Sequence, residues 1–161
     1  MPKSLGSFLE DCRREIPNEV VHVTKELDPA HYDVSALIKH LDAARKFPIL
    51  VFDNPLNLHG KPSDIKLTMN CEISQGKIQV ALGAGKDASR EAMTDLCLEL
   101  EEHRITPVII ERDQAPVMQN VQTGKDVDIY QVPIMRHHYM DGGPYIVMST
   151  ITKERQSGIY N

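Results

Sequence analysis

The first apolar positions of the chain fall three and four residues apart, which is the spacing of one face of a helix. They follow Ser4, a residue type that caps helix N-termini, and Pro17 closes the stretch. The pattern therefore predicts a helix over residues 5–15. The next stretch, residues 19–24, is short and rich in β-branched side chains, so it predicts a strand.

A turn at Asp28-Pro29 separates this strand from a second stripe of apolar side chains at helical spacing. The stripe predicts a second helix, and the members of its apolar face are Val34, Leu37, Ile38 and Leu41. Residues 48–52 then form an uninterrupted apolar run, which is typical of a strand covered on both faces by helices. We therefore expect this strand to lie at the centre of a sheet.

Residues 53–64 are rich in turn-forming residues and lead into residues 65–69, where apolar and polar side chains alternate. This pattern predicts a loop followed by another strand. A short helix is expected around residues 78–82. Either Gly83 or Gly85 should end it, because glycine readily adopts the left-handed conformation found at helix C-termini.

A longer helical stripe at residues 92–100 predicts a further helix, capped by Asp87 or Ser89. Strand-like stretches follow at residues 107–110, 117–121 and 145–152. Alternating strands and helices followed by a β-rich section indicate an α/β (α+β) fold with two domains. We place a mixed α/β domain at residues 1–112 and the start of a β-rich domain at residues 113–161.

The charge pattern argues against two classes of partner. The net charge is −5, from 18 Lys and Arg against 23 Asp and Glu, and the signs alternate without a basic block. Binding to nucleic acid or to an anionic membrane needs clustered basic side chains, so a small molecule or a protein is the expected partner. No segment reaches the roughly 18 consecutive apolar residues that span a bilayer. The widely spaced Cys12, Cys71 and Cys97 are expected to be reduced thiols of a cytoplasmic protein.

The densest group of chemically versatile side chains lies within residues 126–145. Its members are Arg136, His137, His138 and Asp141. A metal-hydrolase site is one interpretation, but adjacent histidines in an extended chain point to opposite sides, so one ion could not easily bind both. The alternative is structural: the arginine and the histidines pair with acidic neighbours, while Gly142-Gly143 makes a tight turn into a strand.

Two other kinds of chemistry are less well supported. Cys12 and Cys97 lie on apolar helix faces, where a free cysteine behaves as a small hydrophobic residue, and only Cys71 remains open as a nucleophile. The Gly83-Ala-Gly-Lys86 stretch lacks the spacing of a phosphate-binding loop and follows a predicted helix. We interpret it as a helix end.

Residues 133–146, PIMRHHYMDGGPYI, resemble a stretch of UbiD-type decarboxylases. In that family a proline and a basic or polar turn precede an Asp-Gly/Ala-Gly-x-Tyr-Ile motif and a strand. Three more segments resemble the family in the same order, namely SLGSFLEDCRRE, VVHVTKELDPAHYDVSALIKHLD and FPILVFDN. The resemblance therefore extends along essentially the whole chain.

The resemblance implies both a function and a fold. UbiD-type enzymes are non-oxidative, reversible decarboxylases of aromatic or α,β-unsaturated carboxylic acids, and they act through a covalent adduct with prenylated FMN. It also implies that the N-terminal domain is followed by the first strands of a split β-barrel flavin-binding domain, and that the full-length protein is a homo-oligomer.

The family's catalytic Arg and Glu residues lie C-terminal to this sequence. No catalytic residue is therefore expected here, and we expect the fragment alone to be inactive. The alternative is a non-catalytic subunit or binding module that pairs with a chain supplying the remaining active site.

The family's cofactor motif has the general form Asn-x-Ser/Gly-x-x-Arg, and its best match begins at Asn161. The resemblance implies that Asn161 binds the divalent metal that tethers the cofactor phosphate, Mn²⁺ or Mg²⁺, with K⁺ as a candidate second ion. A rival alignment places Gln156 at the metal position, but Asn161 then stands where the family has arginine. Met148 and Thr150 share one face of the predicted strand and are expected to line the cofactor pocket, with core packing as the alternative for Met148.

Overall fold

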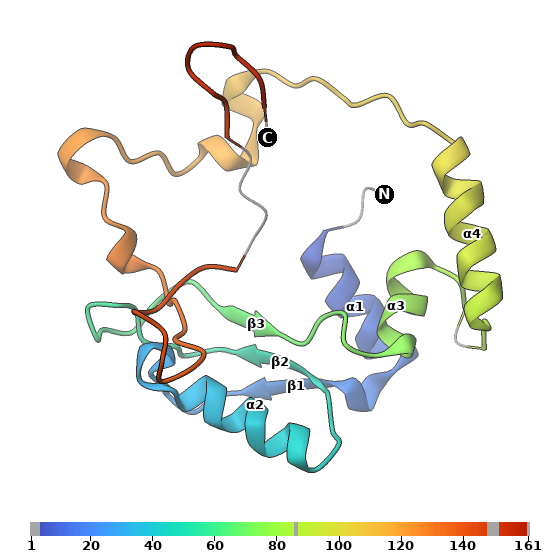
Figure 1. Cartoon of the computed structure of the whole chain (residues 1–161), viewed down its shortest axis with the longest axis horizontal. Helices are drawn as coiled ribbons and strands as arrows, with labels where there is room; N and C mark the ends of the chain where they lie inside the picture. Colours follow the sequence, from blue (N-terminus) through green and yellow to red (C-terminus); the bar gives the residue numbers. More distant parts are fainter. Residues whose placement is uncertain (1–3, 86, 148–151, 161) are drawn as a thin grey trace.

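Three short strands form a small sheet in the N-terminal half of the molecule (Figure 1). The computed structural model describes residues 4–85, 87–147 and 152–160. Strand β1 (Val20–Val23) pairs in parallel with β2 (Ile49–Phe52), and β2 pairs antiparallel with β3 (Leu67–Met69). The strand order β1-β2-β3 places β2 at the centre, as its continuous apolar sequence predicts.

Helices cover both faces of this sheet. Helix α2 (Asp33–Ala43) crosses one face, whereas α1 (Leu5–Glu15) and α3 (Gln75–Leu82) lie against the other. Helix α4 (Arg90–Glu102) packs beside α3, at the margin of the molecule (Figure 1). The predicted helices and strands up to residue 102 are confirmed, and so is the mixed α/β character of the chain.

The central strand is buried on both faces because its side chains alternate between two apolar clusters. Leu50 and Phe52 pack against α2 and against Met135, a residue from the C-terminal third of the chain. Ile49 and Val51 pack against α1 and α3. All four strand residues are at most 4% exposed, so β2 is the core of what we call the α/β layer, residues 4–102.

The predicted alternatives for two helix ends are settled by backbone geometry. Ser89, not Asp87, caps α4, because its side chain accepts a hydrogen bond from the N–H of Ala92. Gly83, not Gly85, ends α3 in a left-handed conformation with φ 71°.

Helix α2 ends in the same motif as α3, but with arginine in the glycine position. Arg45 has φ 53°, and its N–H donates to Asp42 O while the next N–H donates to Leu41 O. The corresponding bonds at the end of α3 run from Gly83 to Val80 and from the next residue to Gln79. A residue with a Cβ atom is sterically strained in this left-handed conformation, whereas glycine is not.

Replacing Arg45 with glycine is therefore expected to stabilise the protein by about 1 kcal/mol, because it removes the left-handed strain. Replacing Gly83 with alanine should destabilise it by a similar amount. Thermal unfolding of the two variants beside the wild type measures both effects. Shifts of the same sign in the two variants would show that backbone strain does not govern these helix ends.

One charged side chain lies in the interior of the α/β layer. Lys77 of α3 has no exposed side-chain surface, and its Nζ donates a hydrogen bond to the carbonyl of Phe47, just before β2. The Glu19 carboxylate lies 3.6 Å from the same Nζ. Burial lowers the pKa of Lys77, and the neighbouring Glu19 opposes this shift.

The arm, residues 103–131, leaves the end of α4 and runs away from the sheet before it returns (Figure 1). It contains four short 3₁₀ turns, at Arg112–Gln114, Pro116–Met118, Gly124–Asp126 and Ile129–Gln131. The strands predicted at residues 107–110 and 117–121 are wrong for the described chain. A strand needs a neighbour to satisfy its backbone N–H and C=O groups, and no described segment hydrogen-bonds to the backbone of residues 105–110.

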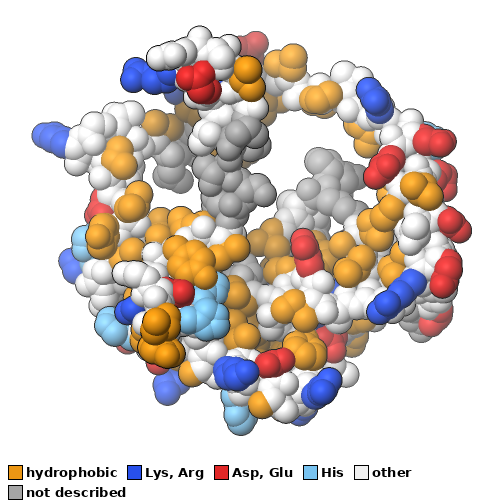
Figure 2. Space-filling view, in the orientation of Figure 1, with side chains coloured by type: hydrophobic (Ala, Val, Ile, Leu, Met, Phe, Trp, Pro, Cys, Tyr) orange, Lys and Arg blue, Asp and Glu red, His pale blue; other side chains and the backbone are white. Residues whose placement is uncertain are grey.

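The apolar side chains of the arm are consequently exposed. Ile105, Val108 and Ile109 are 89%, 86% and 95% exposed. Hydrophobic side chains also gather along the inner rim of the opening between the arm and the α/β layer (Figure 2). An apolar surface of this kind is typical of a region that packs against further protein.

The arm returns to the α/β layer at the loop that follows β2. The N–H of Leu58 donates to Tyr130 O at 2.9 Å, and His59 Nε2 lies 2.9 Å from an Asp128 carboxylate oxygen. The hydrogen bond to His59 lowers the pKa of Asp128. After this contact the chain continues to Met135, which packs in the cluster that contains Leu50 and Phe52.

The β-rich character predicted for the last third is confined to one isolated bridge, Lys153 to Tyr160, within the described chain. Residues 145–147 form no strand, and the rest of the predicted strand lies outside the described residues. The split β-barrel and the two-domain division remain predictions.

Candidate functional site

The segment that sequence analysis singled out as chemically versatile lies against the α/β layer. Ile134 and Met135 anchor it, at 8% and 6% exposure, and Met135 contacts the same cluster as Phe52. The chain then forms the 136–145 loop, which lies beside the N-terminal end of α2 (Figure 1). The loop is thus attached to the core at its start.

Arg136 organises this loop. Its Nη2 donates to Asp141 O at 2.5 Å and to Tyr139 O at 3.2 Å, so one side chain holds the far limb of the loop. The guanidinium carbon lies 5.3 Å from the centroid of the Tyr32 ring, which is within the range of a cation–π contact. Arg136 Nε is buried and has no hydrogen-bond partner among the described residues.

The Arg136 backbone is also fixed to the α/β layer. Its N–H donates to Pro29 O at 3.0 Å, and the Ser35 hydroxyl donates to its carbonyl at 2.6 Å. Tyr32, between these two contacts, has φ 72°, an uncommon conformation for a residue with a side chain. The surrounding contacts hold this conformation in place.

The structural interpretation of this segment needs two corrections. Arg136 pairs with backbone carbonyls and not with acidic side chains, because the loop curls around its guanidinium. The tight turn is made by residues 138–141, in which Asp141 N–H donates to His138 O, and not by Gly142-Gly143. The Asp141 carboxylate closes the turn by accepting from the His138 N–H at 2.7 Å, a bond that the sequence spacing did not indicate.

A pocket of about 660 Å³ opens between α2, the end of β3 and the 136–145 loop. This volume lies within the range of small-molecule sites. Its walls are mainly apolar and aromatic, and the residues on them include Tyr32, Ile38, Phe47, Met69, Asn70, Ile73, Met135, His137, His138 and Tyr139. The His137 ring also stacks on Tyr145, with 4.7 Å between centroids, which joins the two limbs of the loop.

The metal-hydrolase interpretation gains no support from this arrangement. Both His137 and His138 border the pocket. Within the described part of the chain, no group of three or more His, Cys, Asp or Glu side chains could hold a metal ion. The histidines are therefore placed to contact a ligand or a covering segment, and not to form a metal centre by themselves.

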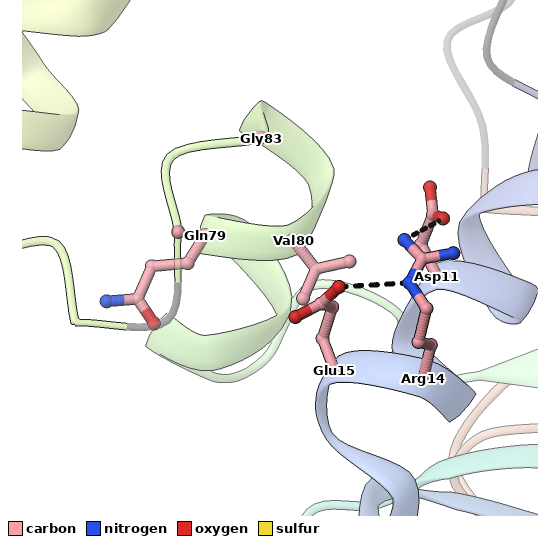
Figure 3. Close-up of a pocket in the computed structure, with 7 residues that line it drawn as sticks. Asp11, Arg14, Glu15, Gln79, Val80 and Gly83 are labelled. Carbon is pink, nitrogen blue, oxygen red and sulfur yellow. Dashed lines mark hydrogen bonds and ion pairs between the residues drawn. The ribbon is translucent and has the colours of Figure 1, made fainter.

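A smaller pocket of about 280 Å³ lies on the opposite side of the sheet, between α1 and the end of α3 (Figure 3). Arg14 lines this pocket and forms ion pairs with Asp11 at 2.6 Å and with Glu15 at 3.0 Å. The hydrogen bond to Glu15, followed by that to Asp11, raises the pKa of Arg14. Since Arg14 already has partners within α1, this pocket offers no free charged group for a ligand.

Cys12 and Cys71 lie in surroundings that disfavour the thiolate form. Burial raises the pKa of Cys71, the thiol left open as a nucleophile, and also that of Cys12. A raised pKa reduces the thiolate that nucleophilic attack requires. Cys12 is fully buried in the α1 cluster, as its apolar helix face predicts.

The three residues predicted to contact the cofactor or metal, Met148, Thr150 and Asn161, lie outside the described residues. Their roles are neither supported nor contradicted by the structure. Among the helices that the structure describes, none is long and apolar enough to cross a membrane.

Sequence analysis missed the partners of Arg136. Pro29 and Tyr32 belong to the turn before α2, and Ser35 lies in its first turn. The Asp28-Pro29 turn was visible in the sequence, but nothing in a local pattern indicates a contact with a residue about a hundred positions away. Only the folded chain brings these groups together.

Comparison with known proteins relates this chain to a family of decarboxylases. Residues 108–161 match the model of the UbiD family, described as the 3-octaprenyl-4-hydroxybenzoate carboxy-lyase Rift-related domain. A phenolic acid decarboxylase from Streptomyces sp. (strain D7) is 28% identical over 144 residues, which make up 88% of this chain and 29% of that protein. The chain therefore spans less than a third of the length of this relative.

Proposed function

We propose that this chain is part of a UbiD-family decarboxylase that removes carbon dioxide from an aromatic or α,β-unsaturated carboxylic acid. The observation that carries the proposal is the match of residues 108–161 to the UbiD model, a segment that includes the 136–145 loop. The similar protein is named a phenolic acid decarboxylase, which supports an aromatic acid as the substrate class.

We propose that the complete protein uses prenylated FMN. When bound, this cofactor supplies the non-oxidative, reversible decarboxylation chemistry through a covalent adduct with the substrate. The described residues provide no catalytic acid or base to which a role can be assigned. Their contribution is a packed α/β layer and the loop that connects it to the proposed flavin-binding part, which we expect to be a split β-barrel.

The proposed metal ligand is Asn161. An amide oxygen is a suitable ligand for a hard divalent cation such as Mn²⁺ or Mg²⁺, and the same holds for K⁺ as an additional ion. Within the described residues, no group of three or more His, Cys, Asp or Glu side chains could hold a metal ion, so the proposed site is centred on Asn161 and not on such a group. Met148 and Thr150 remain proposed pocket-lining residues.

Replacing Asn161 with alanine in the complete protein is expected to reduce metal affinity at least about tenfold, because one direct ligand is lost. Flavin content and carbon dioxide release should fall with it. Metal analysis, flavin absorbance and carbon dioxide release measure the three effects. Gln156→Ala is the matched control, since it removes an amide five positions away that the rival alignment places at the metal; a loss in Gln156→Ala but not in Asn161→Ala would establish the rival alignment.

Residues 1–161 alone are expected to release no carbon dioxide from a panel of aromatic acids with prenylated FMN supplied. The reason is that the chain covers only 29% of the length of its decarboxylase relative. Turnover by this chain alone would overturn the expectation. Recovery of activity when a second chain is added would favour the alternative function, a non-catalytic subunit that pairs with a partner.

We also propose that the complete protein is a cytoplasmic homo-oligomer. The exposed apolar side chains of the arm support further packing, either within the complete protein or between its copies. The acidic net charge and the absence of a basic block in the sequence support a small molecule or a protein, and not nucleic acid or a membrane surface, as the partner.

A further inference from the structure

We propose that Arg136 is a positioning residue, which fixes the start of the proposed flavin-binding part relative to the α/β layer. This inference rests on the proposed function for its catalytic consequence. Its structural content, that one arginine determines the conformation and attachment of the 136–145 loop, stands on the described contacts alone.

Several independent contacts converge on Arg136. Its side chain donates to two carbonyls of the loop, and its cationic end lies over the Tyr32 ring. Its own N–H and C=O are bonded to Pro29 and Ser35, on either side of Tyr32. The same residue thus belongs to the α/β layer through its backbone and to the loop through its guanidinium.

The described loop makes few other hydrogen bonds. Among the described residues, its remaining hydrogen bonds join residues of the same segment: His138 with Asp141, and Tyr145 N–H with Met135 O at 3.2 Å. These bonds define the shape of the loop but do not connect it to α2. The hydrogen bonds to the turn before α2 and to its first turn are made by the Arg136 backbone, and the guanidinium adds the contact with the Tyr32 ring.

The chain leaves the loop at Tyr145. Tyr145 is held between the Met135 carbonyl and the His137 ring, and Met135 is itself part of the core. The loop limb that Arg136 holds, at Tyr139 and Asp141, leads directly to Tyr145. Releasing the guanidinium would free this limb while leaving Met135 in the core.

Two features around Arg136 are energetically unfavourable. Its Nε is buried without a partner among the described residues, and a buried donor without an acceptor is unfavourable. The Tyr32 backbone beneath it is also held with φ 72°. Local costs of this kind persist where the surrounding contacts enforce a geometry, and they concentrate at functional sites.

The test compares Arg136→Met, Arg136→Lys and Arg14→Met in the complete protein. Methionine keeps the apolar stem of the side chain but removes every donor, whereas lysine keeps a cation and part of the donor capacity. Arg14→Met is the matched control, because it removes an arginine that pairs only within α1. Hydrogen exchange of the 136–145 loop, flavin content per chain, kcat and KM are measured for each.

In Arg136→Met we expect amide exchange of His138, Asp141 and Tyr145 to accelerate at least tenfold, while exchange in β2 stays as in the wild type. Flavin content should fall, and kcat per bound flavin should fall about tenfold with little change in KM, because misplacement by a fraction of an ångström affects the reacting geometry more than substrate capture. Arg136→Lys should recover part of each loss, and Arg14→Met should match the wild type.

Unchanged loop exchange in Arg136→Met would overturn the inference. If that variant unfolds as a whole, Arg136→Lys decides, because it keeps a cation but lacks the guanidinium whose Nη2 donates to the carbonyls of Tyr139 and Asp141. Loop exchange faster than in the wild type, with β2 unchanged, supports the inference, and exchange equal to the wild type overturns it. A wild-type protein that binds no flavin and releases no carbon dioxide would instead refute the proposed function, and loop exchange would still report on Arg136.

Discussion

Replacing Phe52 with alanine is expected to lower the free energy of unfolding by about 3–5 kcal/mol, which is among the largest effects of any single substitution. Phe52 is 1% exposed at the end of the central strand and packs in the cluster that contains Val34, Leu50 and Met135. Its removal would therefore leave a cavity between the sheet, α2 and the segment that begins the candidate site. Urea denaturation followed by circular dichroism measures the change.

Ile109→Ala is the control for Phe52→Ala, because Ile109 is also apolar but is 95% exposed in the arm. A substitution at an exposed position usually changes stability by no more than about 0.5 kcal/mol. A loss at Phe52 no larger than that at Ile109 would contradict the assignment of the core. A large loss at Ile109 in the complete protein would show that the arm packs against residues outside this chain.

Replacing Lys77 with alanine is expected to destabilise the protein by about 3 kcal/mol, although burial of a lysine is usually destabilising. The stem of Lys77 fills space in the interior, and its ammonium satisfies the Phe47 carbonyl. Alanine would remove both. Lys77→Met restores most of the volume but not the donor, so it should lose only about 1–2 kcal/mol.

Lys39→Met is the matched control for the two Lys77 variants, since the Lys39 side chain is 82% exposed and forms only a 3.7 Å ion pair with Asp42. An exposed pair of this kind contributes at most about 1 kcal/mol. Denaturation of all three variants under one condition separates volume from hydrogen bonding. A Lys77→Met protein as stable as the wild type would show that the Phe47 carbonyl does not need the ammonium.

These substitutions also separate what can be read locally from what cannot. Phe52 stands in a continuous apolar run, so its burial in a central strand is predictable from the sequence. Lys77 stands in a helix with a weak apolar stripe. Its burial is not predictable from the sequence, because it depends on the position of the Phe47 carbonyl, thirty residues earlier in the chain. The same distinction applies to Arg45, whose left-handed conformation has no signal in an arginine.

The arm shows how a correct local preference can fail to produce the predicted element. Residues 108–110 are β-branched and apolar, which favours an extended chain, and they are indeed not helical. A strand, however, is defined by pairing, and the described chain supplies no partner for this segment. The error arose because pairing is a property of two segments, whereas propensity is a property of one.

The candidate site divides in the same way. Its position in the sequence was found, because arginine, histidine and aspartate gather in residues 136–141 beside two glycines. Its contacts were not found: the arginine binds carbonyls and an aromatic ring, and its backbone is held by Pro29 and Ser35. Pro29, Tyr32 and Ser35 are about a hundred residues away from Arg136, and no spacing rule reaches that far.

The sequence by itself determined the helices and strands of the α/β layer, the central place of β2 and the family resemblance. These features follow from apolar period, capping residues and local motifs, whose physical basis lies within a few consecutive residues. Only the tertiary structure decided that Lys77 is buried, that the arm has no strand partner in the described chain, and that Arg136 joins its loop to the start of α2. Each of these depends on which distant groups are close enough to donate, accept or pack, and that proximity exists only once the chain has folded.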